Sequence, residues 1–117
     1  MASPNSDGAR GEALAATYLE RKGFRILARN YRIRQGEIDL VAADAEYLLF
    51  VEVKTRKAGA WLRGEEAVDA HKQARLLAAA EHYLSREPCE QQPRFDVICL
   101  ELQDDRCTAL RWHKNAF

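Results

Sequence analysis

Two carboxylates and an amine stand out in the stretch GEIDLVAADAEYLLFVEVK, which spans residues 36–54. Apolar residues alternate along both halves of this stretch, as they do in two β-strands joined by a turn. Asp39, Glu52 and Lys54 interrupt this pattern, because charged side chains are costly in a half-buried sheet unless they pair or bind a metal. The three charges therefore need partners that an ordinary hairpin does not supply.

The spacing of the two acids predicts that they face each other across the hairpin. If the turn is of even length and centred between residues 45 and 46, Asp39 lies directly opposite Glu52. Lys54 then follows on the same side of the sheet, because side chains two residues apart in a strand share a face. The preceding residues on that side are apolar, so we expect the charges at the end of an apolar stripe that another element covers.

Two predicted helices each carry one polar residue on their apolar face. In the first, Glu12 shares a face with alanine and leucine residues at spacings of three, four and seven. In the second, Gln73 is in line with the apolar residues Leu76, Leu77, Ala80 and Leu84. Both side chains would then aim at the sheet. Glu12 is also explained as a first-turn acid favoured by the helix dipole, and Gln73 as the point where the stripe runs out into water.

A hard divalent cation suits such a cluster. Magnesium prefers oxygen ligands, so two carboxylates, a backbone carbonyl and water would form a suitable octahedral shell. Such an ion lowers the pKa of a bound water and neutralises charge on a phosphate, while a neighbouring lysine helps to hold either group. The alternative is a buried ion pair between Lys54 and one of the two acids, which would neutralise only one of them. From the residues alone, both interpretations stay open.

Two helices and five strands account for most of the 117 residues. We expect helices at 8–24 and 67–87, the second capped near Asp69, and strands at 25–33, in the two halves of the opening stretch, at 94–102 and at 107–113. Residues 55–67, with two glycines and Trp61, predict a loop. The order α-β-β-β-α-β-β is typical of an α/β domain with a mixed sheet and helices packed on it. Residues 1–7 are expected to form a flexible leader and 8–117 a single domain.

The charge is balanced overall but unevenly distributed. Eighteen basic and eighteen acidic residues give a net charge of zero, which by itself argues against nucleic-acid binding. Between residues 10 and 34, however, seven basic residues outnumber two acids, and between 81 and 105 seven acids outnumber two basic residues. A neutral total can therefore hide a basic face, although solvated charges on ordinary surfaces explain the same distribution.

The remaining composition predicts a cytoplasmic protein. Cys89, Cys99 and Cys107 form no CxxC pair, so neither a disulfide framework nor a zinc ribbon is indicated, and we expect reduced thiols in or near the core. No apolar run approaches the length of a membrane span. The first residues show neither the basic start nor the apolar stretch of a secretory signal.

The order of the motifs resembles the YraN-like family of small bacterial proteins. The resemblance extends from Gly8 to Phe117 and rests on Glu12, GEIDLV (36–41), FVEVKTR (50–56), AVDAHKQARLLAAAEHYL (67–84), RFDVICL (94–100) and the closing WHKNAF. The family is similar to the restriction-endonuclease-like superfamily, whose signature is an aspartate, a gap and Glu-x-Lys, and especially to archaeal Holliday junction resolvases. The resemblance implies a mixed central sheet flanked by helices. It also implies a metal-dependent endonuclease that acts on branched or otherwise structured DNA.

The same resemblance implies roles for individual residues. Asp39 and Glu52 would be the metal-binding carboxylates for Mg²⁺ or Mn²⁺, with the backbone carbonyl of Val53 as a further ligand. Lys54 would be the catalytic lysine. The implied catalytic set is Glu12, Asp39, Glu52, Lys54 and Gln73, in which Glu12 is also a candidate metal ligand.

DNA is the expected partner. The residues that we expect to follow the phosphate backbone are Arg10, Arg34, Arg56, Lys57, Arg63, Lys72 and Arg75. A symmetric homodimer is the simplest way for a small chain to supply two cutting sites. Two alternatives stay open, namely a non-catalytic nucleic-acid-binding or assembly module that keeps the nuclease fold, and a structural ion-pair hairpin with its basic residues solvated.

Overall fold

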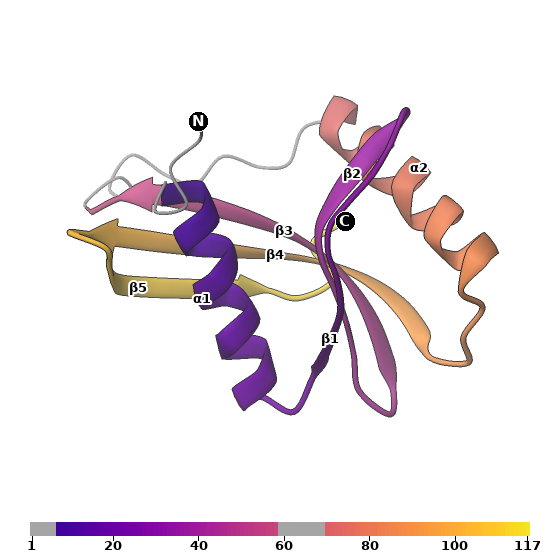
Figure 1. Cartoon of the computed structure of the whole chain (residues 1–117), viewed down its shortest axis with the longest axis horizontal. Coiled ribbons are helices and arrows are strands. Elements are labelled where there is room, and N and C mark those ends of the chain that lie inside the picture. The colour runs from indigo at the N-terminus through magenta and orange to yellow at the C-terminus, as the bar shows by residue number, and fades with distance from the viewer. Residues whose placement is uncertain (1–6, 59–69) are drawn as a thin grey trace.

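The computed structural model describes residues 7–58 and 70–117, in which two helices and five strands follow in the predicted order (Figure 1). The elements are α1 (Asp7–Arg21), β1 (Arg25–Ile33), β2 (Gly36–Ala43), β3 (Tyr47–Lys57), α2 (Ala70–Arg86), β4 (Gln92–Gln103) and β5 (Arg106–His113). The strands form one sheet in the order β1-β2-β3-β4-β5. Among the described strands, only β3 and β4 pair in parallel, and α2 lies in the connection that this pair requires. The predicted mixed sheet flanked by helices is confirmed.

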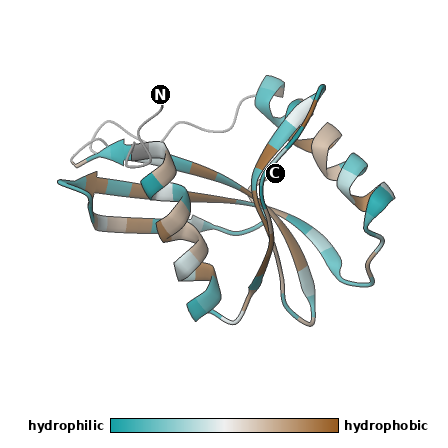
Figure 2. Ribbon diagram, viewed as in Figure 1, coloured by the Kyte–Doolittle hydropathy of each residue, from teal (hydrophilic) through white to brown (hydrophobic). Residues whose placement is uncertain are grey.

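The two helices cover opposite faces of the sheet. Figure 1 shows α1 in front of the strands, where it contacts β3 most and also β1, β2 and β4, whereas α2 lies beside β2. The buried side chains form one large cluster with α1 and another with α2. We call the two sides of the sheet the α1 face and the α2 face. Figure 2 shows hydrophobic segments concentrated in the strands where they cross the middle of the molecule.

Helix α1 buries its predicted apolar face and ends just before the predicted C-terminal glycine. Ala15, Ala16 and Leu19 are fully buried, so the face that they share with Glu12 does aim at the sheet. At the other end, Gly23 adopts a left-handed φ of 94°, and the N–H of Phe24 donates to the Leu19 carbonyl at 3.0 Å. This is the hydrogen bond of a Schellman cap, which glycine makes without steric cost.

The β2–β3 hairpin has the predicted register. Leu40 pairs with Val51 and Val41 with Phe50, and the Asp44 N–H donates to the Tyr47 carbonyl at 3.1 Å to close the turn. The Asp44 carboxylate accepts two further bonds, from the N–H groups of residues 46 and 47 at 2.8 and 2.7 Å. An aspartate that caps its own turn in this way holds the strands in one register.

Helix α2 packs closely on the start of β2. A Cβ atom at Gly36 would lie 1.8 Å from the Arg75 backbone oxygen, so only glycine allows this contact. Leu76 and Ala80 are buried as predicted, but Leu77 is 42% exposed. The predicted stripe was wrong at this position because Leu77 is adjacent to Leu76 in sequence and is rotated about 100° from it around the helix axis.

Several predicted boundaries and burials differ from the structure. Residues 55–57, expected in a loop, form the end of β3 because they pair with β4. The part of that loop from residue 59 onward, which includes Trp61 and Arg63, and the predicted helix cap at Asp69 lie outside the described residues. Cys99 is buried, but Cys89 and Cys107 are exposed, because they lie in a connection and on an edge strand. None of the helices described in residues 7–58 and 70–117 has both the length and the apolar content to cross a membrane.

Candidate functional site

Strands β2 and β3 separate at the point where the two predicted acids lie. Their pairing ends at Leu40 and Val51, after which β2 continues to pair with β1 and β3 with β4. Figure 1 shows β1 and β2 turning away from β3 beyond this point, which we call the fork. Asp39 is the first unpaired position of β2, and its Oδ2 accepts a hydrogen bond from the Val53 N–H at 2.8 Å. A carboxylate thus satisfies a backbone donor that has lost its strand partner.

The side chains of Asp39 and Glu52 share a hydrogen bond at the fork, so the two predicted acids do meet, although the strand pairing ends one position before them. Burial raises the pKa of Glu52 from its ordinary value of 4.5 to about 7, and the charge of Asp39 adds to this rise. Burial also raises the pKa of Asp39, against which the Val53 N–H bond stabilises the charged form. The pair therefore takes up a proton more readily than two exposed carboxylates would, and a bound cation can take the place of that proton.

Glu12 of α1 lies close enough to interact with Asp39, one member of this pair. Burial and then the charge of Asp39 raise the pKa of the Glu12 carboxyl. The helix approaches β3 tightly at the preceding residue, because a Cβ at Gly11 would lie 2.1 Å from Thr55 Oγ1. The structure therefore brings together Glu12, Asp39 and Glu52, which we call the acid cluster.

Basic side chains surround the acid cluster. Lys54 is only 6% exposed, and its charge and that of Lys72 partly offset the effect of burial on the pKa of Glu52. Arg32 of β1 has the same offsetting effect on the pKa values of Glu12 and Asp39, which burial raises. Arg32 also forms an exposed ion pair with Glu37 at 3.3 Å. The sequence analysis singled out the two lysines, whereas Arg32 entered it only as one of the seven basic residues between positions 10 and 34.

The donor set of the fork fits a magnesium ion. Asp39 and Glu52 supply hard oxygen donors, and the Val53 carbonyl faces the same strand edge as the Val53 N–H that contacts Asp39. Within residues 7–58 and 70–117, no three histidine, cysteine, aspartate or glutamate side chains are grouped to hold a metal. Magnesium does not require three, since it commonly keeps several waters and takes one or two carboxylates.

The other predicted site residues are spread over several elements of the fold. Gln73 is half-buried in the first turns of α2, next to Lys72 and two residues before Arg75. Arg34 is exposed in the β1–β2 turn, Arg56 and Lys57 end β3, and Arg63 is outside the described residues. The Arg10 Nε donates to the Asp105 carbonyl at 3.3 Å, which places Arg10 beside the β4–β5 turn.

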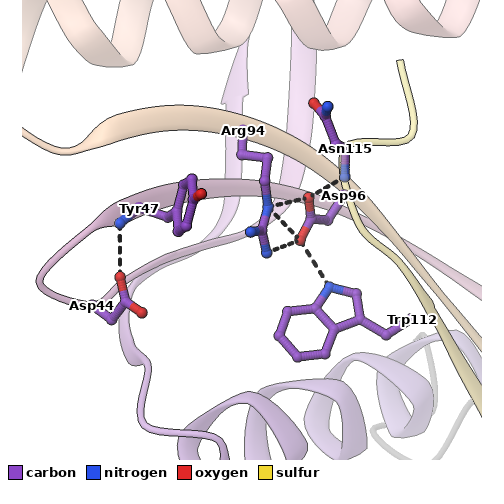
Figure 3. Close-up of polar contacts among 6 residues, drawn as sticks. All are labelled: Asp44, Tyr47, Arg94, Asp96, Trp112 and Asn115. Carbon is purple, nitrogen blue, oxygen red and sulfur yellow. Dashed lines mark hydrogen bonds and ion pairs between the residues drawn. The ribbon is translucent and has the colours of Figure 1, made fainter.

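Asp96, a second buried acid that sequence reasoning did not single out, has a structural role (Figure 3). It is fully buried and accepts hydrogen bonds from the Arg94 guanidinium, the Trp112 Nε1–H and the Asn115 backbone N–H at 2.8–2.9 Å. The hydrogen bonds between Arg94 and Asp96 raise the pKa of Arg94, whose guanidinium lies 4.5 Å from the Tyr47 ring centroid. Because donors surround its carboxylate, Asp96 joins the C-terminal residues to β4 rather than serving chemistry.

Comparison with known proteins identifies the family to which this chain belongs. The family model described as "Uncharacterised protein family UPF0102" matches residues 11–100, a range that includes the whole acid cluster. UPF0102 proteins of Ectopseudomonas mendocina, Symbiobacterium thermophilum and Chlorobium chlorochromatii are 41%, 48% and 51% identical to the chain. These alignments cover 100%, 94% and 84% of this chain and 98%, 94% and 78% of the respective relatives. The chain therefore belongs to the UPF0102 family, the YraN-like family whose motifs it shares and whose restriction-endonuclease-like placement agrees with the mixed sheet.

Proposed function

We propose that this protein is a metal-dependent endonuclease that hydrolyses phosphodiester bonds in branched or otherwise structured DNA. The observation that carries the proposal is the contact between Asp39 and Glu52 at the fork, with Lys54 buried two residues further along β3. Partly buried carboxylates in contact are unfavourable without a proton or a cation, and they do not stabilise an ordinary sheet. Metal-dependent hydrolysis of a phosphodiester uses two carboxylates that hold a cation, with an amine beside them.

Each side chain of the fork has a role in this chemistry. Asp39, Glu52 and the Val53 carbonyl would hold Mg²⁺ or Mn²⁺, which supplies positive charge to the scissile phosphate when bound. The Lys54 ammonium, held at the edge of the core, orients the attacking water or the phosphate oxygen. Glu12 adds a negative charge beside Asp39 and favours retention of the cation. Arg32 and Lys72, whose charges act on the acids of the cluster, would contact the DNA backbone.

The DNA partner and a homodimer are part of this proposal. Basic residues on β1, α2 and the end of β3 supply phosphate contacts that do not depend on sequence, and such binding weakens steeply as salt concentration rises. Two strands of a junction need two cutting sites, which a symmetric dimer provides. Light scattering with and without a four-way junction tests this step, because a monomer in the cleavage-competent complex would contradict it.

The experiment that tests the activity combines substrates, metals and matched variants. Labelled four-way junction, flap, duplex and single-stranded DNA are incubated with the protein in Mg²⁺, Mn²⁺ or a chelator. We expect metal-dependent cleavage of structured DNA that falls by about 100-fold or more in Asp39→Asn and Glu52→Gln, since both remove a metal ligand. Glu46→Gln, an exposed acid in the β2–β3 turn, is the control and retains activity.

Two results would overturn the proposal. Cleavage that persists in both Asp39→Asn and Glu52→Gln would come from a contaminating nuclease. DNA binding by the wild-type protein without cleavage of any of the four substrates in either metal would instead favour a non-catalytic module that keeps the nuclease fold.

A further inference from the structure

Asn30 has an unusual backbone conformation for its place in the fold. Four described residues other than glycine have a positive φ, and three of them, Asp104, Asp105 and Asn115, lie in turns. Asn30 lies inside β1 with a φ of 50°. Asparagine is disfavoured in strands, although it tolerates the left-handed region better than most residues. Because Asn30 is exposed, core packing does not account for this conformation.

At Asn30, the regular alternation of β1 side chains between the two faces of the sheet is interrupted. Ala28 packs with the α2 cluster, and a regular strand would place residue 30 on that same face. Instead Tyr31 and Ile33 pack there, so the alternation shifts by one residue between Arg29 and Tyr31. The shift leaves Asn30 off the α2 face.

The bend in β1 lies directly opposite the fork. Arg29 pairs with Leu40 and Tyr31 with Ile38, so Asn30 is opposite Asp39. The alternation of β2 shifts at the same level, because Leu40 packs with the α1 cluster and Ile38 with the α2 cluster. Asp39 is also the first residue of β2, moving away from the β2–β3 turn, that has no pairing partner in β3. The two strands of the hairpin thus bend together at the position where the fork opens.

The Asn30 side chain contacts the acid cluster from this bend. Its amide lies within side-chain hydrogen-bonding reach of the Glu12 carboxylate, to which an amide N–H can donate. An amide donor stabilises the ionised form of a carboxylate and limits the directions in which it can point. Glu12 is therefore anchored from two sides, by the close approach of α1 to β3 at Gly11 and by β1 through Asn30.

We propose that Asn30 is a positioning residue of the acid cluster: its left-handed backbone bends the β1–β2 hairpin at the fork, and its amide orients Glu12 beside Asp39. This inference rests on the proposed function in that the oriented carboxylate serves a bound divalent cation. Residues that orient metal-site carboxylates typically contribute about 10- to 100-fold to metal affinity or activity.

Two substitutions separate the backbone role from the amide role. Asn30→Gly keeps the left-handed conformation without steric cost but removes the amide, whereas Asn30→Ala removes the amide and disfavours the conformation. We expect Asn30→Gly to unfold at the same temperature as the wild-type protein or at a higher one, and Asn30→Ala at a lower one. Asn115→Gly is the matched control, because it makes the same change at a left-handed residue in a turn outside the acid cluster.

Binding of Mn²⁺, followed by electron paramagnetic resonance, measures the amide role. We expect Asn30→Gly to bind Mn²⁺ about 10-fold more weakly than the wild-type protein, and Asn115→Gly to bind it equally well. In a double-mutant cycle, Asn30→Gly should have no further effect once Glu12 is replaced by Gln, because it acts through that side chain. Equal affinity in wild-type and Asn30→Gly protein, or an undiminished effect in the Glu12→Gln background, would overturn the inference.

A metal-free measurement distinguishes failure of this inference from failure of the proposed function. The side-chain amide protons of Asn30 are observed by nuclear magnetic resonance in chelator. We expect one of them to be shifted and slow to exchange, and to lose both properties in Glu12→Ala but not in Glu20→Ala, which changes an exposed acid of the same helix. That result supports the positioning of Glu12 even if the wild-type protein cleaves no DNA. Unshifted, rapidly exchanging amide protons in the wild-type protein would overturn it even if cleavage is found.

Discussion

Because Glu52 is partly buried beside Asp39, the metal-free protein should lose stability as the pH rises. The folded state raises the pKa of Glu52 from 4.5 to about 7, chiefly through burial and then through the charge of Asp39. A raised pKa means that the folded protein binds the proton more tightly than the unfolded chain does. The resulting stabilisation is complete below about pH 4.5 and is lost as the pH rises through about 7.

The size of this loss follows from the shift and from the exposure of the side chain. A rise from 4.5 to about 7 corresponds to about 3 kcal/mol if solvent screening is ignored. Glu52 is only half-buried, so solvent screens part of the interaction, and a loss of about 1 to 2 kcal/mol in the free energy of unfolding is the realistic expectation. The raised pKa values of Asp39 and Glu12 act in the same direction.

Urea unfolding in chelator at a series of pH values between about 5 and 8 measures the effect. The Glu52→Gln variant carries no charge at this position, so it should lack most of the pH-dependent loss and be more stable than the wild-type protein at pH 8. The difference between the two proteins at each pH removes contributions from histidines and other groups. Parallel pH profiles for wild-type and Glu52→Gln protein would refute the reasoning, because they would show that Glu52 titrates normally.

Four further outcomes are expected. Millimolar Mg²⁺ should restore stability to the wild-type protein at pH 8 but much less to Glu52→Gln, as calorimetric melting would show. Gly36→Ala should destabilise the protein by about 2 kcal/mol, because its Cβ would lie 1.8 Å from a backbone oxygen of α2, whereas Gly8→Ala, with open space around it, should not. Asp96→Asn should cost about 3 kcal/mol and speed hydrogen exchange in the C-terminal residues, since it breaks a buried ion pair. Asp105→Gly should raise stability by about 0.5 to 1 kcal/mol in urea unfolding, because Asp105 has a φ of 64°.

Local patterns predicted the elements and the register well because short-range physics determines both. The apolar periodicity and Gly23 located α1, and the alternation on either side of the Asp44 turn determined that Asp39 would face Glu52. Errors arose where tertiary pairing extended or uncovered an element. Residues 55–57 became strand because β4 lies beside them, and Leu77 remained exposed because α2 packs mainly on β2.

The sequence by itself determined the order of elements, the hairpin register and the types of residue at the fork, since these depend on neighbours within a few positions. Tertiary structure alone decided how those residues are arranged relative to one another and which side chains contact them. The bend at Asn30, the approach of Arg32 to the acids and the enclosure of Asp96 join segments that are far apart in the chain, and no local periodicity encodes them. The elevated pKa of Glu52 has the same origin, because burial and a facing carboxylate exist only once β2 and β3 have paired and then separated.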